Sequence, residues 1–280
     1  MPQWFNNIAL TALRRGGFTL KSFEYRSSPV YYVEGGKIDG PVFVVFPGFG
    51  DNIFSWTRFM LRFGRHYRVL GLDFPGYTGK SPHPPTGDIL RFSDQEAVAE
   101  KFLHDIAKQV DVLVGNSMGG WIALRMAKKH PGKIGEIVAL NPAGVFTDEK
   151  ELRRVRALYD IESYGDYVHM MRHLWAKIPL YFYPFSFFGF YQFTRHPIVR
   201  TILDSIEREH FLNDILPLME TPISVVWGER DTLFPKKMGK FIAKTAPNAK
   251  YYPIAEAGHM PQVETPDLVY SLMDRILKLS

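Results

Sequence analysis

The stretch VLVGNSMGGWIALRMA, residues 112–127, decides the fold of this chain. A short apolar run leads into the pentapeptide GNSMG at 115–119, and an apolar helical run follows it. A strand, a tight turn of the form G-x-S-x-G and a helix, in this order, hold the serine in a strained conformation at the end of the strand. The flanking glycines remove side chains that would collide in such a turn. The pattern predicts that Ser117 is a nucleophile at the edge of a sheet.

Short apolar runs alternate with helical segments along most of the chain. We expect strands at Val42–Phe46, Arg68–Asp73, Asp111–Gly115, Ile137–Asn141, Ile223–Trp227 and Lys250–Ile254. We expect helices at Ser55–Gly64, Asp94–Gln109, Met118–His130, Pro235–Thr245 and Pro266–Leu279. Several strands are apolar at every position, as in VFVVF, which is typical of strands buried on both faces. The alternation predicts an α/β fold, with a mostly parallel central sheet flanked by helices on both faces.

Two segments depart from this alternation. Phe18–Tyr25 and Pro29–Glu34 are joined by a short polar turn, and we expect them to form an antiparallel hairpin at the sheet edge. Later, an amphipathic helix in DEKELRRVRALYDI, an aromatic stretch and a second helical run interrupt the strand–helix pattern. We therefore expect a core made of residues 1–144 and 216–280, with a helical cap inserted at 145–215.

A nucleophilic serine needs a base and an acid that orients the base. His259 follows the last expected strand and precedes the final helix, which gives the order serine, acid, histidine along the chain. Asp231, in VVWGERDTLFP, follows the preceding strand and would hold the imidazole in the useful tautomer. Glu229 in the same loop and Asp148 after the strand before it are the alternatives for the acid.

Acyl transfer also needs N–H donors for the oxyanion that develops on the substrate. The backbone amide of Met118, directly after the serine, is one expected donor. The second is the amide of Phe49 in FPGFGDN, where Gly48 and Gly50 let the chain approach closely. Taken alone, this loop would be interpreted as an ordinary Gly-Pro turn, and only its place after the strand VFVVF favours the oxyanion role.

Composition narrows the class of protein and its partners. Hydrophobic residues make up 46% of the chain and charged residues 22%, which is typical of a globular protein. The net charge of +5 is spread without a run of Lys and Arg, so we expect no nucleic-acid partner. The absence of cysteine excludes disulfides, thiolate catalysis and zinc–thiolate sites, and no cofactor or metal is implied. The oligomeric state stays open.

The N-terminal sequence indicates where in the cell the protein is expected. The first thirteen residues lack the basic segment of a secretion signal, and no stretch reaches the ~20 apolar residues of a membrane span. We expect a cytoplasmic protein, with peripheral membrane contact through the N-terminal helix or the cap as a further option. WFNNIALTALRRGGF predicts a short amphipathic helix that either packs on its own domain or binds lipid. In the lipid-bound alternative, the apolar residues Trp4, Phe5, Ile8 and Leu13 face lipid and Arg14 and Arg15 face the headgroups.

The cap carries ten aromatic residues between Trp175 and Phe193. One hypothesis is that part of this set lines an acyl-chain pocket or forms a lid that opens at lipid surfaces. We take Trp175, Phe182, Phe185 and Phe188 as the substrate-binding candidates. The alternative is that these rings only pack the cap on the sheet, and a lid that moves would satisfy both descriptions.

The segments PGFGDNIFSW, GLDFPGYTGKS, GNSMGG, NPAG, WGERD and AGHMPQVETP, in this order, resemble the motifs of the α/β-hydrolase superfamily over nearly the whole chain. Within it, GNSMGG, NPAG and a helical cap are most similar to bacterial lipases and esterases related to monoacylglycerol lipases. The resemblance implies a serine esterase that hydrolyses lipid-like acyl esters. Pro47 stands where the family usually has the histidine of an HG motif, which leaves the backbone role of Phe49 intact.

Two other functions stay open. GNSMGG also resembles carbon–carbon bond hydrolases of the meta-cleavage type, although those have a Ser-Gly oxyanion segment and an aromatic residue after the catalytic histidine. Here the segment is PGFGDN, and Met260 follows His259. The other alternative is a lipid-binding protein that keeps the fold without efficient turnover, against which the complete set of serine, histidine and aspartate argues.

Overall fold

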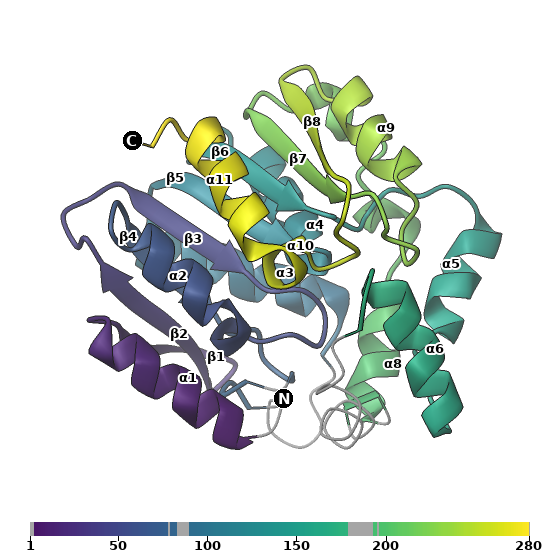
Figure 1. Ribbon diagram of the computed structural model, residues 1–280, viewed down its shortest axis with the longest axis horizontal. Helices are drawn as coiled ribbons and strands as arrows, with labels where there is room; N and C mark the ends of the chain where they lie inside the picture. Colours follow the sequence, from purple (N-terminus) through teal and green to yellow (C-terminus); the bar gives the residue numbers. More distant parts are fainter. Residues whose placement is uncertain (1–2, 78, 83–89, 179–192, 195, 280) are drawn as a thin grey trace.

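One eight-stranded sheet organises the chain (Figure 1). The computed structural model describes residues 3–77, 79–82, 90–178, 193–194 and 196–279. The strands lie in the order β1-β2-β4-β3-β5-β6-β7-β8. Their bounds are β1 Thr19–Tyr25, β2 Ser28–Gly36, β3 Val42–Phe46, β4 Arg68–Leu72, β5 Val110–Asn116, β6 Ile134–Leu140, β7 Ile223–Gly228 and β8 Ala249–Ile254. β2 runs antiparallel to β1 and β4, whereas all pairs from β4 to β8 are parallel.

Helices cover both faces of this sheet. In the described residues they are α1 Gln3–Arg15, α2 Thr57–Phe63, α3 Phe92–Phe102, α4 Met118–Lys129, α5 Glu149–Ala157, α6 Tyr164–Leu174, α8 Pro197–Asp204, α9 Lys237–Thr245, α10 Pro261–Glu264 and α11 Pro266–Ile276. Figure 1 places α1, α2 and α11 on one face, and α3 and α4 on the other. The expected α/β fold with a mostly parallel sheet is confirmed.

The strand VFVVF shows why this sheet is buried on both faces. Phe43 and Val45 belong to the apolar cluster under α1, α2 and α11. Val44 and Phe46 belong to the cluster under α3, α4 and α9. Successive side chains point to opposite faces of a strand, so a run without polar residues fills two cores at once. Within the first cluster, the Phe43 ring stacks on that of Phe63 with centroids 5.1 Å apart.

The sequence located the strands to within a few residues, and the antiparallel hairpin β1–β2 is confirmed. The helix expected at Asp94–Gln109 begins earlier, at Phe92, and ends in a π-helical turn at Leu103–Ala107. Helix α6 was not expected, although a capping box begins it. The Ser163 hydroxyl accepts the Asp166 N–H at 3.2 Å, and the Asp166 carboxylate accepts the Ser163 N–H at 2.8 Å.

Helices α5, α6 and α8 stand between β6 and β7 in the chain and form the predicted cap region (Figure 1). Buried residues of α6, among them Tyr167 and Met171, form an apolar cluster separate from the two cores of the sheet. Helix α8 instead joins the core under α3 and α4 through Ile198 and Ile202. The boundaries at 145 and 215 remain a prediction, and residues 179–192 of the aromatic stretch lie outside the described residues.

Helix α1 packs on its own domain, the first of the two alternatives. Leu10 and Leu13 belong to the core beneath α1, and Leu13 is 0% exposed. The expectation that Leu13 faces lipid is therefore wrong, because the helix turns this residue toward the sheet. Trp4 and Ile8 lie on the outer side and are 58% and 61% exposed. No described helix is long and apolar enough to cross a bilayer.

This arrangement makes a matched prediction for two residues of α1. Leu13→Ala should lower the free energy of unfolding by about 2–5 kcal/mol, because it opens a cavity in a packed core. Ile8→Ala should change it by less than about 0.5 kcal/mol, because the side chain is already in water. Urea denaturation of both variants measures the difference. Equal effects of the two substitutions would show that α1 does not pack as described.

Candidate active site

Ser117 stands at the sharp turn between β5 and α4. Its backbone has φ 53° and ψ −119°, a conformation that costs a non-glycine residue about 1–3 kcal/mol. The Ser117 N–H donates to the Leu140 carbonyl at 3.0 Å. The Ser117 carbonyl accepts the N–H groups of Trp121 at 3.0 Å and Ala143 at 3.1 Å. The surrounding backbone therefore holds the strained residue in place, as the G-x-S-x-G pattern predicts.

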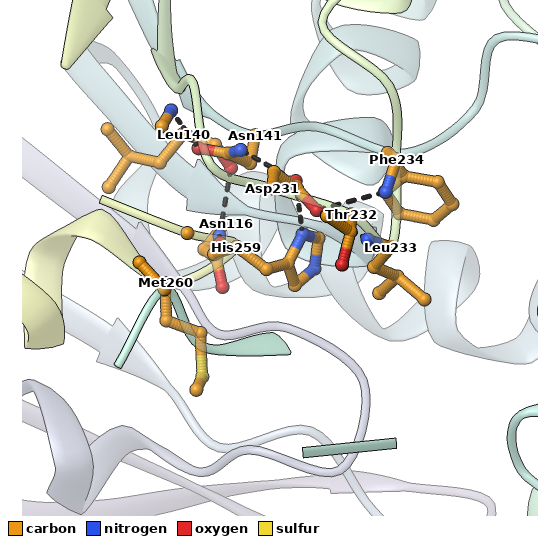
Figure 2. Close-up of polar contacts among 12 residues, drawn as sticks. Asn116, Leu140, Asn141, Asp231, Thr232, Leu233, Phe234, His259 and Met260 are labelled. Atoms are coloured by element: carbon orange, nitrogen blue, oxygen red, sulfur yellow. Dashed lines mark hydrogen bonds and ion pairs between the residues drawn. The ribbon is translucent and has the colours of Figure 1, made fainter. Parts of the chain in front are cut away.

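Asp231 and His259 form a buried pair in the loops that follow β7 and β8 (Figure 2). His259 Nδ1 lies 2.8 Å from Asp231 Oδ2, and the two side chains are 4% and 0% exposed. Asp231 Oδ1 accepts the backbone N–H groups of Leu233 at 2.8 Å and Phe234 at 3.0 Å. A carboxylate fixed in this way favours the tautomer with a proton on Nδ1, which leaves Nε2 free to act as a base.

Asn141, the first residue of the NPAG motif, orients the acid. Its Nδ2 donates to Asp231 Oδ2 at 2.7 Å, and its Oδ1 accepts the Gly228 N–H at 2.9 Å. The residue is fully buried and has φ 41°. It follows β6, the strand between the serine strand and the acid strand. Its position in NPAG was the only sequence signal, and the motif alone did not show what the side chain contacts.

The alternative acids lie elsewhere. The Glu229 carboxylate pairs with Lys236 at 3.5 Å. The Asp148 carboxylate accepts the Glu151 N–H at 2.8 Å and caps the N-terminus of α5. Among the described residues, the acidic side chain bonded to the His259 ring is that of Asp231.

The backbone of His259 forms hydrogen bonds through both its carbonyl and its N–H group. Its carbonyl accepts Asn116 Nδ2 at 3.0 Å, and the same amide nitrogen reaches the Leu140 carbonyl at 2.9 Å (Figure 2). Its N–H donates to the Leu174 carbonyl, at the end of α6, at 2.9 Å. No hydrogen bond joins Ser117 to His259 among the described contacts. Such bonds are often long before substrate binds, and here Asn116 links the turn that carries the serine to the loop that carries the histidine.

The expected oxyanion loop packs against the serine turn. A Cβ on Gly48 would stand 3.3 Å from the Cβ of Ser117, so the two segments are in contact. The registers of β3 and β5 pair Phe46 with Gly115, which brings the ends of these strands to one edge. Among the described contacts, the N–H groups of Phe49 and Met118 have no protein acceptor. Two amides beside the serine without acceptors suit the donor role predicted for them.

Asp51 braces the same loop. Its Oδ2 accepts the Ser55 hydroxyl at 2.9 Å and the indole N–H of Trp56 at 3.0 Å. Burial raises the pKa of Asp51, and these hydrogen bonds oppose the shift because they favour the charged form.

A largely apolar pocket opens beside Ser117. It encloses about 750 Å³ of space not filled by atoms, part of it open to solvent. Phe49 and Met118 line it together with Trp121 and residues of α5. Burial raises the pKa of the Tyr159 hydroxyl, so this pocket residue stays protonated. The chemistry of the lining suits an apolar group bound next to the serine.

The charged residues that line the pocket in the described part of the chain are Asp148, which caps α5, and Glu151 and Arg156 on that helix. Glu151 pairs with Arg154, with Oε1 2.7 Å from Nη2. Arg156 Nη2 donates to the Leu203 carbonyl at 3.0 Å, and its Nε is buried without a partner. No cluster of three histidine or acidic side chains suited to a metal ion occurs in the described part of the chain.

The aromatic residues predicted to bind substrate are not found in the pocket among the described residues. Trp175 is 6% exposed and packs in the apolar cluster of α6, and it does not line the pocket beside Ser117. Phe182, Phe185 and Phe188 lie outside the described residues. The rings that the sequence did not single out, Trp121 and Phe211, line the pocket and stack with centroids 5.3 Å apart.

Comparisons with known proteins give the family. The model of the alpha/beta hydrolase family matches residues 42–272. Lipase 1 of Psychrobacter immobilis is 26% identical over 249 residues, which cover 84% of this chain and 76% of that protein. A 2-hydroxy-6-oxononadienedioate/2-hydroxy-6-oxononatrienedioate hydrolase of Pseudomonas is 25% identical over 251 residues, which cover 81% of this chain and 84% of that one.

Solved structures repeat the fold. MGS-M2, an alpha/beta hydrolase from a deep-sea metagenome of the Medee basin, superposes with a TM-score of 0.77 at 22% identity. The superposition covers 93% of this chain and 98% of the other.

The geometry predicts the behaviour of two variants toward a fluorophosphonate, which phosphonylates activated serines. Ser117→Ala should abolish labelling, and His259→Ala should slow it by ~10³-fold or more, because the base is lost. Ser117→Ala should unfold within about 1 kcal/mol of the wild type, because it removes a single oxygen atom. His259→Ala should be destabilised by about 1–3 kcal/mol, because it leaves the buried Asp231 carboxylate without this partner, and it should be assayed at a temperature where it is folded. Mass spectrometry of the labelled peptide checks the site. Labelling of Ser117→Ala at the wild-type rate would contradict the assignment.

Proposed function

The chain belongs to the alpha/beta hydrolase family, and we propose that it is a serine-dependent hydrolase of carboxylic esters with apolar acyl chains. The observation that carries the proposal is the 2.8 Å bond between His259 and Asp231, made at the same sheet edge as the strained Ser117. The similarity to lipases supports ester hydrolysis as the reaction.

The reaction would proceed through an acyl-enzyme. His259 Nε2 takes the hydroxyl proton while Ser117 Oγ attacks the ester carbonyl carbon. The N–H groups of Phe49 and Met118 hold the negative charge that develops on the carbonyl oxygen. The carbon–oxygen bond to the alcohol breaks, and His259 returns the proton to the leaving alkoxide. Water, deprotonated by the same imidazole, then releases the acid and restores the serine.

The pocket supports an apolar acyl group as the bound half of the ester. Its lining beside Ser117 is formed by aliphatic and aromatic side chains, including Val155 and Phe211. Burial of a chain in such a pocket contributes about 0.8 kcal/mol for each CH₂ removed from water. Longer chains should therefore be preferred until the pocket is full.

A carbon–carbon bond hydrolase is the second candidate. It is favoured by the similarity to the Pseudomonas hydrolase and by Arg156, a pocket residue with no carboxylate partner in the described ion pairs. A guanidinium could hold a carboxylate of a dienedioate-type substrate. A catalytically weak lipid-binding protein is the remaining alternative.

The first test is hydrolysis of p-nitrophenyl esters from acetate to palmitate, with a monoacylglycerol and a 2-hydroxy-6-oxo-dienedioate alongside. We expect kcat/KM to rise from acetate toward medium chains. Val155→Phe should lower the rate for the longer chains by ~10-fold and spare acetate, because it fills the pocket. Ala157→Phe is the matched control, since this position is on the same helix and exposed to solvent. Turnover of the dienedioate alone would replace ester hydrolysis with the carbon–carbon reaction.

We also propose that α1 touches a lipid surface at its outer side. Trp4 and Ile8 are one helical turn apart and both more than half exposed. Arg14 and Arg15 follow in the last turn and are exposed as well. Exposed tryptophan beside basic residues suits the headgroup region of an anionic bilayer.

The double variant Trp4→Ser, Ile8→Ser should weaken binding to phosphatidylserine-containing vesicles by ~10-fold or more, because each large apolar side chain contributes about 1.5–3 kcal/mol when buried. Leu218→Ser is the control, since Leu218 is 60% exposed but lies outside α1. Vesicle sedimentation measures the bound fraction. Unchanged binding of the double variant would exclude α1 as the contact.

A further inference from the structure

Glu264 is a half-buried carboxylate close to the base, and the proposed mechanism leaves it unused. It ends the short helix α10, five residues after His259 in AGHMPQVETP. None of the ion pairs formed in the described residues involves it. Its charge interaction is with His259. A glutamate partly removed from water without a cation needs hydrogen-bond donors of another kind.

The partners are backbone amides on both sides of the histidine. Glu264 Oε1 accepts the N–H of Gly258 at 3.0 Å and the N–H of Met260 at 3.1 Å. The N–H between them, that of His259, donates to the Leu174 carbonyl at 2.9 Å. Three successive amides are therefore fixed, two by one carboxylate oxygen and one by the end of α6.

The second carboxylate oxygen reaches the cap region. Glu264 Oε2 accepts the Ala176 N–H at 2.7 Å, two residues after the end of α6. The loop of the histidine lies tight against this segment, because a Cβ on Gly258 would stand 2.6 Å from the Ala176 nitrogen. One side chain thus joins the loop of the base to the segment that follows α6.

The loop that carries Asp231 is also hydrogen-bonded to the C-terminal end of α6. The Leu233 N–H donates to the His173 carbonyl at 3.1 Å, and Thr232 Oγ1 donates to the Arg172 carbonyl at 3.4 Å. The last carbonyls of α6 are acceptors that the helix itself does not use. They hold the loops of both Asp231 and His259, and the Glu264 side chain adds a hydrogen bond to this interface on the histidine side.

We propose that Glu264 is a positioning residue, which holds the His259 loop against the segment after α6 and so sets the place of the imidazole for the proposed serine chemistry. The proposal rests on the proposed function. Its basis is geometric: a carboxylate can accept three N–H groups at once, and neither an amide nor an apolar side chain can do so. Burial raises the pKa of Glu264, and the three donors together with the charge of His259 act against that shift.

Three variants separate the bonds from the charge. Glu264→Ala removes all acceptors, and Glu264→Asp keeps the charge but shortens the reach by one CH₂. Glu264→Gln keeps one acceptor oxygen for the Gly258 and Met260 amides, while its NH₂ faces the Ala176 amide. Glu256→Gln is the control, because this glutamate is exposed and lies on the same loop.

We expect Glu264→Ala and Glu264→Asp to lower kcat ~10–100-fold with KM little changed, since a misplaced base slows chemistry more than binding. The fluorophosphonate labelling rate should fall in parallel. Glu264→Gln should give a kcat between those of Glu264→Ala and the wild type, since it keeps the bonds beside the histidine but loses the bond to Ala176. Glu256→Gln should match the wild type in every measurement.

A readout that needs no turnover completes the test. The proton on His259 Nδ1, bonded to Asp231, should give a resolved low-field NMR signal in the wild type and a weaker one in Glu264→Gln. The signal should broaden or vanish in Glu264→Ala and Glu264→Asp. A full signal and a kcat within twofold of the wild type in a folded Glu264→Ala or Glu264→Asp variant would overturn the proposal. A wild type with the signal but no ester turnover or labelling would refute the proposed function instead, and the signal would still decide the role of Glu264.

Discussion

Helix α4 begins so close to β3 that only a residue without a side chain can stand at the contact. A Cβ on Gly119 would lie 2.2 Å from the Phe46 carbonyl oxygen and 2.4 Å from that of Pro47. This approach sets the sharp turn at Ser117 and brings the loop after β3 against it. The amides of Phe49 and Met118 can then lie beside the serine. Strain at one residue is thereby offset by packing and hydrogen bonding around it.

The parallel register of β5 to β8 supplies the rest of the site. Parallel strands end at one edge, so loops far apart in the sequence meet there. Gly228 makes the same kind of close contact as Gly119, since a Cβ on it would stand 2.1 Å from the Gly258 carbonyl oxygen. The loops of Asp231 and His259 can approach each other because this side chain is missing. Asn141 fills the space between the serine strand and the acid strand, where its amide bonds both Asp231 and Gly228.

The cap region contributes to both the pocket and the catalytic loops. Helix α5 lines the pocket beside Ser117, and the end of α6 accepts hydrogen bonds from the loops of Asp231 and His259. A movement of α6 would therefore change the support of the acid and the base as well as access to the serine. Of the aromatic residues that mark this region in the sequence, two are described: Trp175 packs within the cap, and the Phe193 ring contacts that of Phe49 with centroids 5.6 Å apart.

The sequence by itself determined the fold and the residue types of the site. The signals were local: apolar runs of strand length, the G-x-S-x-G turn, and the chain order of Ser117, Asp231 and His259. Such patterns can be recognised in the sequence without a structure. Tertiary structure alone decided which side of α1 is buried, which rings line the pocket, and what Asn141 and Glu264 contact. Apolar residues lie around much of α1, so the sequence pattern does not predict which of them faces the core. Polar residues inside the fold bind partners that are distant in the chain: Asn141 and Asp231 are 90 residues apart, and Glu264 and Ala176 are 88 apart, so no spacing rule can pair them.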